Sequence, residues 1–215
     1  MGEPWEGSVL EIGCGEGDLG KMLWDRDGNC YHGIDYSKEA IAKAHQKYPT
    51  IPFTCSDYRT HVEMNMHWDR IVMQGILEHL DNPFTELKWM MDNLLADKGD
   101  VITSSPCFLN PRGIVWMTLD MLGAVMSKTD LHYLNPCDFQ NFCYDNSCLL
   151  EWDTCDYSWA HDVDMITDLK KRIPLALKDG GIPYSEDNLS AFIEWLDCRY
   201  FPTNHGATVV YRISK

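Results

Sequence analysis

Val9-Leu-Glu-Ile-Gly-Cys-Gly-Glu-Gly17 joins a short apolar run to three alternating glycines. The apolar run predicts a buried parallel strand, which the glycines end. Leu19, Met22 and Leu23 then recur at helical spacing, so we expect a strand, a glycine turn and a helix. Glycines permit a positive φ and let a ligand approach the backbone, and a helix N-terminus offers unpaired N–H groups to a ligand carboxylate. The segment therefore predicts a ligand site at the end of a strand.

Other readings of the glycines remain open. A glycine turn also occurs in ordinary junctions between a loop and a helix. The dinucleotide pattern G-x-G-x-x-G fits Gly15, Gly17 and Gly20, but it sits late relative to the strand. A triphosphate loop is disfavoured because no Gly-Lys-Ser/Thr follows.

The alternation of strand and helix continues along the chain. Ser37 is expected to cap one helix, and Asn82 and Pro83 to begin another that Gly99 ends. This alternation predicts an α/β fold with a doubly wound, mostly parallel sheet that binds its ligand at the carboxyl ends of the strands. Further strands are expected at 30–35, 53–57, 68–74, 100–106, 149–152 and 207–213.

Two segments resemble the class I S-adenosylmethionine-dependent methyltransferases. Val9–Gly17 is similar to the family's first motif, E/D-x-G-x-G-x-G, and Gly75–Pro83 resembles its x-x-L-E-H-x-x-D-P segment beneath the methionine part of the cofactor. The resemblance implies a Rossmann-like, seven-stranded sheet with an antiparallel last strand and a helical insertion after the fifth strand. It also implies a single domain over 1–215, with 107–146 and 161–200 as lid or substrate-side helices.

S-adenosylmethionine is the cofactor that the resemblance implies, and S-adenosylhomocysteine the product. Asp35 ends the second strand, where a carboxylate can accept hydrogen bonds from both ribose hydroxyls; an ordinary surface acid is the alternative. In the family, an acid at the position of Asp57 binds the adenine amino group and its neighbour, here Tyr58, packs on the ring; a turn cap is the alternative for Asp57. The expected cofactor contacts are Glu11, Gly13, Cys14, Gly15, Gly17, Asp35, Tyr36, Asp57, Tyr58, Gln74 and Gly75.

Residues 113–126 predict a helix that is apolar nearly all round. It is either a buried packing helix, a pocket wall that includes Trp116, or a homodimer contact. His132–Phe139 resembles the H-x-x-x-[TSN]-P-x-x-[LF] segment of small-molecule methyltransferases related to the ubiquinone-pathway enzymes, where it spans the mouth of the active site. Helices are further expected at 162–178 and at 185–200, the second capped by Ser185.

Only a few residues indicate where the methyl acceptor would bind. A sulfonium methyl is already electrophilic, so the protein must align an acceptor and exclude water; it needs a base only for a protonated acceptor, and no metal. His132 is the first candidate for that base because imidazole titrates near neutral pH, and His79 is the second. A hydrogen-bonded structural histidine is the alternative for both. His132, Tyr133 and Trp116 are the expected substrate contacts, and His161 is a further candidate without a spacing rule to select it.

Composition excludes some partners. The formal charge of −15 and the lack of a basic run argue against nucleic acid, and Met73-Gln-Gly-Ile stands where a motif for planar amines would be. Residues 113–126 are too few to cross a bilayer, and no signal peptide is evident, so we expect a cytoplasmic protein. Nine cysteines without C-x-x-C pairs suggest reduced thiols. A zinc site is a minor alternative, at Cys137, Cys143, Cys148 and Cys155.

Two classes of function follow. The first is a methyltransferase acting on an oxygen or nitrogen of a small molecule. The second is a non-catalytic S-adenosylmethionine-binding partner or sensor, favoured by the short segment of eight residues before the first strand, which cannot form the helices that cover the cofactor in the family. A related enzyme that uses the cofactor without methylation is a smaller alternative.

Overall fold

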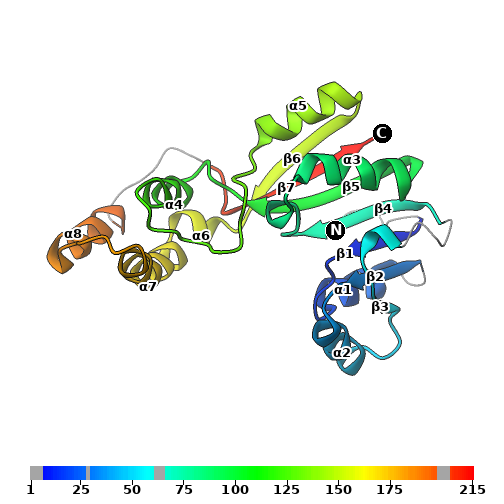
Figure 1. Ribbon diagram of the computed structural model, residues 1–215, viewed down its shortest axis with the longest axis horizontal. Helices are drawn as coiled ribbons and strands as arrows, with labels where there is room; N and C mark the ends of the chain where they lie inside the picture. The colour runs from blue at the N-terminus through cyan, green and yellow to red at the C-terminus, as the bar shows by residue number, and fades with distance from the viewer. Residues whose placement is uncertain (1–6, 28–29, 61–65, 198–203) are drawn as a thin grey trace. The chain divides into compact units, whose positions relative to one another are not determined.

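The computed structural model describes residues 7–27, 30–60, 66–197 and 204–215 (Figure 1). The chain divides into two compact units, and each is described by itself. Unit 1 holds Met1–Ser104, Phe139–Glu151 and Tyr211–Lys215, and unit 2 holds Ser105–Asp138 and Trp152–Val210. The expected lack of helical cover before the first strand falls mostly on 1–6, outside the described residues.

Seven strands form one sheet in the order β3-β2-β1-β4-β5-β7-β6. The pairs β2–β3, β1–β2, β1–β4 and β4–β5 are parallel, and β7 runs antiparallel between β5 and β6, so the predicted fold class is confirmed. Parallel strands end at one edge, which brings the ends of β1, β2 and β4 together. The strands are β1 (Val9–Ile12), β2 (Tyr31–Asp35), β3 (Phe53–Cys55), β4 (Trp68–Gln74), β5 (Leu95–Pro106), β6 (Leu149–Cys155) and β7 (Thr208–Ser214).

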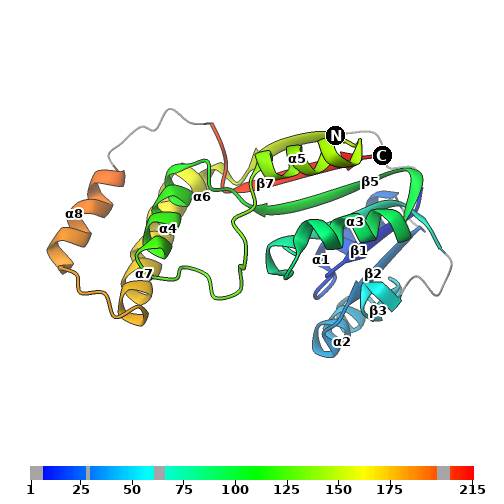
Figure 2. The same cartoon turned by 45° about the horizontal axis from the view of Figure 1, so that its top comes forward.

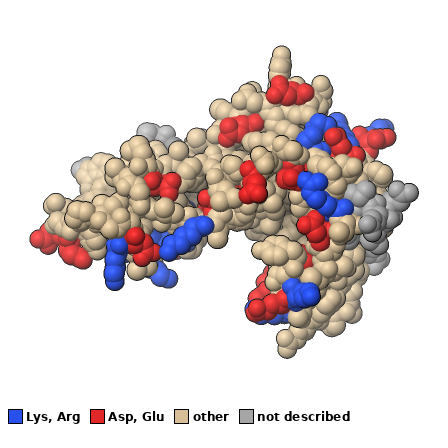
Figure 3. Space-filling view, in the orientation of Figure 1, with Lys and Arg blue, Asp and Glu red and all other residues tan. Residues whose placement is uncertain are grey.

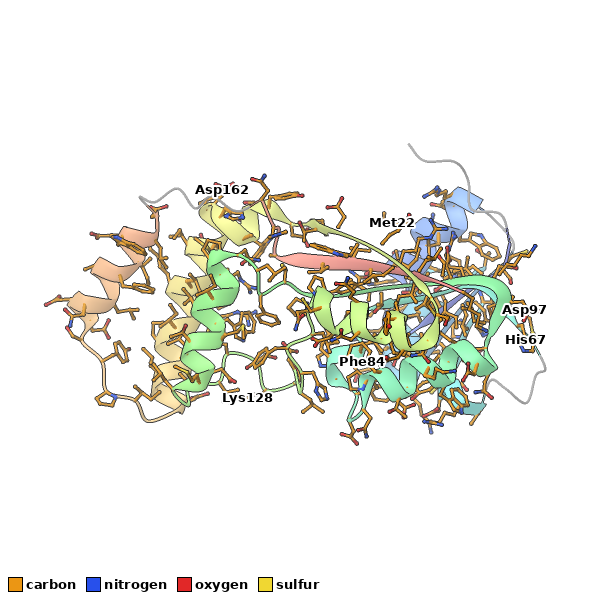
Figure 4. All side chains as sticks on the ribbon, turned by 90° about the horizontal axis from the view of Figure 1, so that it is seen from above. Met22, His67, Phe84, Asp97, Lys128 and Asp162 are labelled. Atoms are coloured by element: carbon orange, nitrogen blue, oxygen red, sulfur yellow. The ribbon has the colours of Figure 1, made fainter. Side chains whose placement is uncertain are left out.

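Helices α2 and α3 of unit 1 begin where the sequence predicts. Ser37 caps α2, since its hydroxyl accepts a hydrogen bond from Ala40 N at 3.2 Å. Phe84 of α3, labelled in Figure 4, packs against the rings of Phe139 and Phe142 from α5, at centroid distances of 5.2 and 5.6 Å. The bounds are α1 (Asp18–Asp27), α2 (Lys38–Lys47), the short 3-10 helix η2 (Leu77–His79), α3 (Pro83–Asn93) and α5 (Pro136–Asn146), which begins in unit 2.

The end of α3 differs from the prediction. The helix ends at Asn93 and β5 begins at Leu95, so Gly99 does not stop a helix and the fifth strand starts five residues before Asp100. Leu95 already pairs with Trp68, and the register of β4 and β5 shifts between Trp68 and Arg70. A Cβ on Gly99 would lie 2.9 Å from the carbonyl oxygen of Asp69, so this glycine marks an irregularity of the sheet rather than a helix end.

The apolar helix is shorter than predicted. α4 (Pro111–Met121) ends before Gly123, so the expected span of 113–126 is wrong at its C-terminal end. Gly123 has φ +90°, its N–H donates to Asp120 O, and Ala124 N donates to Leu119 O, each at 2.9 Å. This is the Schellman arrangement, in which a left-handed glycine satisfies the last carbonyls of a helix.

Unit 2 is built around α7 (Val163–Asp179), with α4, α6 (Tyr157–His161) and α8 (Glu186–Asp197) (Figure 2). Apolar residues of α7 at helical spacing, among them Met165, Leu169 and Ile173, are buried against Trp116 of α4 and Ile193 of α8. The predicted helix at 162–178 is thus confirmed as α7. A separate short helix, α6, precedes it. The last residues of the predicted helix 185–200 lie outside the described residues.

Three helices share one way of starting. Asn82, Asn110 and Asn135 each directly precede the proline with which α3, α4 and α5 begin. Asn110 is fully buried: its Oδ1 accepts from Gly113 N at 2.9 Å, and its Nδ2 donates to the carbonyls of Cys107 and Gly206 at 3.0 and 2.7 Å. A proline at the first helical position costs no hydrogen bond, because that N–H has no partner inside the helix.

On the face drawn in Figure 3, Lys and Arg side chains are interspersed with Asp and Glu. Within the described residues, no helix is both long and apolar enough to span a membrane.

Candidate active site

The glycine loop after β1 is the centre of the candidate site in unit 1. Gly13, Gly15 and Gly17 have φ values of +78°, +53° and +84°, which favour glycine. A Cβ on Gly13 would meet Ile76, and one on Gly17 would meet the ring of Phe53, so both are tightly packed. A Cβ on Gly15 would meet no described atom within 4 Å. The loop is therefore open at its middle glycine alone, where a ligand can reach the backbone.

Asp35 joins this loop to the end of β2. Its Oδ2 accepts a hydrogen bond from Gly15 N at 2.9 Å, and its Oδ1 accepts one from Ser37 N at 2.8 Å. A carboxylate oxygen has two lone pairs, so each oxygen can accept a further hydrogen bond from a hydroxyl. Asp35 is thus placed beside the open glycine with capacity left for a ribose.

Glu11 lies beneath the loop and is 2% exposed. The Tyr31 hydroxyl donates a hydrogen bond to it. Burial raises the pKa of Glu11 to about 7, the Tyr31 hydrogen bond opposes this rise, and the charge of Asp35 adds to it. Cys14 is also buried, and burial raises the pKa of its thiol. Glu11 and Cys14 therefore support the loop from inside.

The end of β4 contributes a second group of residues. Gln74 is exposed at the strand end, and Gly75 follows with φ +64°. Glu78, which the sequence analysis did not select, is 2% exposed, and its Oε1 would lie 3.5 Å from a Cβ on Gly75. The Leu-Glu-His pattern was the available signal for Glu78. His79 is exposed at the end of η2.

Three of the expected cofactor contacts, of which Asp57 and Tyr58 were expected at the adenine, differ in their surroundings. Tyr36, directly after Asp35, is 86% exposed. Asp57 caps a turn, since its Oδ1 accepts from Arg59 N at 2.8 Å, which is the alternative that the sequence left open. The Tyr58 hydroxyl donates to Glu86, which also pairs with Arg59. Adenine contacts by these residues stay predictions.

The expected acceptor residues lie in unit 2. His132 is half-buried in the segment between α4 and α5, and Tyr133 follows it. Burial and a hydrogen bond to Asp120 raise the pKa of Tyr133. Trp116 is 4% exposed, with the guanidinium carbons of Arg112 and Arg172 at 4.6 and 5.3 Å from its ring centroid. Their roles toward an acceptor stay predictions.

The described cysteines contain no disulfide: Cys143 is buried, Cys137 is exposed, and Cys148 and Cys155 are half-buried. In the described ranges, no three His, Cys, Asp or Glu side chains gather in a way that could hold a metal ion. His161, the remaining candidate, contacts the carbonyl oxygen of His205 at 2.8 Å.

Comparisons with known proteins agree with this fold. Residues 9–99 match a family model described as "Methyltransferase domain". A comparison with curated protein sequences gave no match. Many solved structures share the fold, and the three named below are all below 20% identical to this chain. A SAM-dependent methyltransferase from Archaeoglobus fulgidus is 16% identical to this chain, with a TM-score of 0.59. The alignment covers 97% of this chain and 86% of the Archaeoglobus fulgidus chain.

A cyclopropane-fatty-acyl-phospholipid synthase-like protein from Lactobacillus casei ATCC 334 has 15% identity and a TM-score of 0.61, with coverage of 97% and 84%. The plantazolicin methyltransferase, solved with SAH and a triazolic substrate analogue, has 18% identity and a TM-score of 0.56, with coverage of 97% and 76%. These likenesses concern the fold. The match over residues 9–99 is to a methyltransferase domain, in agreement with the resemblance of the glycine motif. The ubiquinone-like branch is not confirmed.

Proposed function

We propose that this protein binds S-adenosylmethionine at the glycine loop and transfers its methyl group to an oxygen or nitrogen of a small-molecule acceptor. The observation that carries the proposal is the conformation of Gly15: its backbone is left-handed, no described atom lies within 4 Å of a Cβ built on it, and its N–H donates to Asp35. The flanking Gly13 and Gly17 are packed, so Gly15 alone of the three leaves space for a ligand among the described residues.

The residues of unit 1 fit that cofactor. Asp35 has free acceptor capacity for the ribose hydroxyls, exposed Tyr36 offers an aromatic face, and Gln74 and Gly75 lie at the neighbouring strand end. The bound cofactor supplies an electrophilic methyl group on a sulfonium. The chain has then to hold an acceptor in line with the S–CH3 bond and to exclude water. His132 is the proposed base for an acceptor that arrives protonated.

The test is calorimetric titration of S-adenosylhomocysteine into the full chain and into Gly15→Val. We expect the variant to lose detectable binding, because the new side chain occupies the open space. The matched control is Gly181→Val: Gly181 also has a positive φ, +65°, and its Cβ would also meet no described atom within 4 Å, but it lies in unit 2. The control should bind normally; equal binding by both variants refutes the site.

Turnover separates an enzyme from a non-catalytic binder. The chain is incubated with S-adenosylmethionine and a pool of small metabolites, and mass spectrometry follows S-adenosylhomocysteine and products heavier by one methylene. Binding with no methylated product from any pool would favour the partner or sensor function. The fragmentation of a product identifies the methylated atom as oxygen or nitrogen.

A further inference from the structure

Unit 2 contains a cavity of about 390 Å³ between α4, α7 and α8. In Figures 1 and 2, α4 and α7 lie side by side. The wall of the cavity includes Ile114, Val115, Thr118, Phe192 and Trp195. Nothing in the methyltransferase motif accounts for this cavity, because all of its lining residues follow residue 106.

The wall offers almost no hydrogen-bonding group. Thr118 is its one residue with a polar side chain apart from the indole of Trp195, and the Thr118 hydroxyl already donates to Ile114 O at 2.8 Å. No charged side chain is among the described residues that line the cavity, and Asp168 of α7 binds Arg112 and Arg172, each at 2.8 Å. A polar group buried here would lose its hydrogen bonds to water without replacement, so the cavity favours a hydrocarbon.

The volume of the cavity and its opening to the surface further restrict the kind of ligand that can bind. An apolar cavity of ~150 Å³ holds one benzene, so about 390 Å³ accommodates a dozen carbon atoms or more. The cavity also reaches the surface, because Ile114 is 60% and Trp195 47% exposed, and the stacked rings of Phe192 and Trp195 lie 6.4 Å apart. A chain can therefore enter with one end while its other end stays in water.

We propose that this cavity binds a single hydrocarbon chain of about 12 carbons, carried by an amphiphile whose polar head remains in solvent. The inference goes beyond the proposed function and uses unit 2 alone. A second copy of the chain is a poorer occupant, since a stable dimer needs a broad complementary surface of about 800 Å² per partner rather than one concave opening.

The experiment titrates octanoate, decanoate, dodecanoate and hexadecanoate into the full chain, each below its micelle concentration. Affinity should rise by roughly tenfold for each two methylenes and level off near dodecanoate, when the cavity is full. Ile114→Asp should weaken dodecanoate binding by at least about tenfold, because it places a charge at the exposed edge of the cavity.

Met121→Asp is the matched control, because Met121 lies on the same helix, is 78% exposed and does not line the cavity. It should bind dodecanoate like the parent. Val115→Trp fills the cavity without adding charge and should also weaken binding. Circular dichroism verifies that each variant is folded.

Equal weakening by Ile114→Asp and Met121→Asp, or affinity independent of chain length, overturns the proposal. So does sedimentation that shows a dimer dissociated by Ile114→Asp in a chain that binds no dodecanoate. S-adenosylhomocysteine titrations of the same samples keep the two proposals apart: retained cofactor binding without chain binding rejects the cavity proposal alone.

Discussion

At the scale of single residues, replacing Asp35 tests whether this carboxylate binds the cofactor. Asp35→Ala removes the proposed acceptor for the ribose and the partner of Gly15 N. We expect S-adenosylhomocysteine affinity to fall by roughly 1.5–3 kcal/mol, the scale for hydrogen bonds to a charged group. Calorimetry measures it. Glu39→Ala, which removes an exposed acid of α2, should leave affinity unchanged. An unchanged affinity in Asp35→Ala would mean that the ribose is held elsewhere.

Glu11 gives a prediction about pH. Its pKa is about 7 in the folded chain against an ordinary 4.5, so the folded state binds more protons than the unfolded state between these values. Stability therefore falls as pH rises from 4.5 to 7, by about 3 kcal/mol from this group. Glu11→Gln keeps an acceptor for Tyr31 and removes the charge.

We expect Glu11→Gln to flatten the pH dependence of the unfolding free energy and to be the more stable protein at pH 8. Urea denaturation at pH 5, 6, 7 and 8 measures this. Parallel pH profiles for the parent and the variant would show that Glu11 titrates near its ordinary value.

At the scale of elements, Asp100 ties three strands of the sheet together. It accepts from Arg70 of β4 and Arg212 of β7, with Nε–Oδ distances of 2.5 and 2.8 Å. Burial raises its pKa, but the two arginines outweigh burial and hold the pKa below its ordinary value. The contribution to stability is present above the ordinary pKa and is lost as pH falls.

Asp100→Asn should destabilise the chain by about 3 kcal/mol or more, because it removes a buried carboxylate charge that pairs with the largely buried Arg70. Glu151→Gln is the control: it contacts the same Arg212 but its side chain is 74% exposed, so a loss below about 1 kcal/mol is expected. Guanidinium denaturation compares them. Similar losses in both variants would contradict a special role for the buried carboxylate.

Sequence patterns predicted the elements better than their ends. The strand–glycine–helix unit around Gly15 was predictable because local φ requirements and apolar periodicity agree there. Gly99 and Gly123 were misread for opposite reasons. Gly99 was taken as a helix end, although close approach to Asp69 requires it inside the strand. Gly123 was passed over because apolar residues continue beyond it, although its left-handed backbone ends α4.

The candidate site was predictable to a similar degree. The positions of Gly15 and Asp35 were predictable, because Gly15 closely follows, and Asp35 ends, a strand that the sequence pattern predicts. The turn at Asp57, the Tyr58–Glu86 hydrogen bond and the burial of Glu78 depend on contacts between distant segments, which no local pattern encodes. The three helices that form the cavity of unit 2 were predicted, but the way they pack together is encoded by no local pattern.

At the scale of the whole molecule, the glycine loop and the proposed base His132 belong to different units. His132→Ala should therefore keep cofactor affinity within about threefold and slow methyl transfer by ~10²–10⁴, the loss expected for a general base. Single-turnover rates and calorimetry measure the two quantities once an acceptor is known. A raised KM with a small change in kcat would make His132 a binding residue, and unchanged turnover would direct attention to His79 or His161.

The paired asparagine and proline at the starts of α3, α4 and α5 also bear on how this protein ages. Asparagine loses its amide mainly through attack by the backbone nitrogen of the next residue, and a proline nitrogen carries no hydrogen. Asn82, Asn110 and Asn135 are thereby shielded from that reaction. At Asn110 the shielding matters most, because an aspartate would turn a carboxylate toward the carbonyls of Cys107 and Gly206. Slow chemical damage in stored protein should therefore spare these three helix starts.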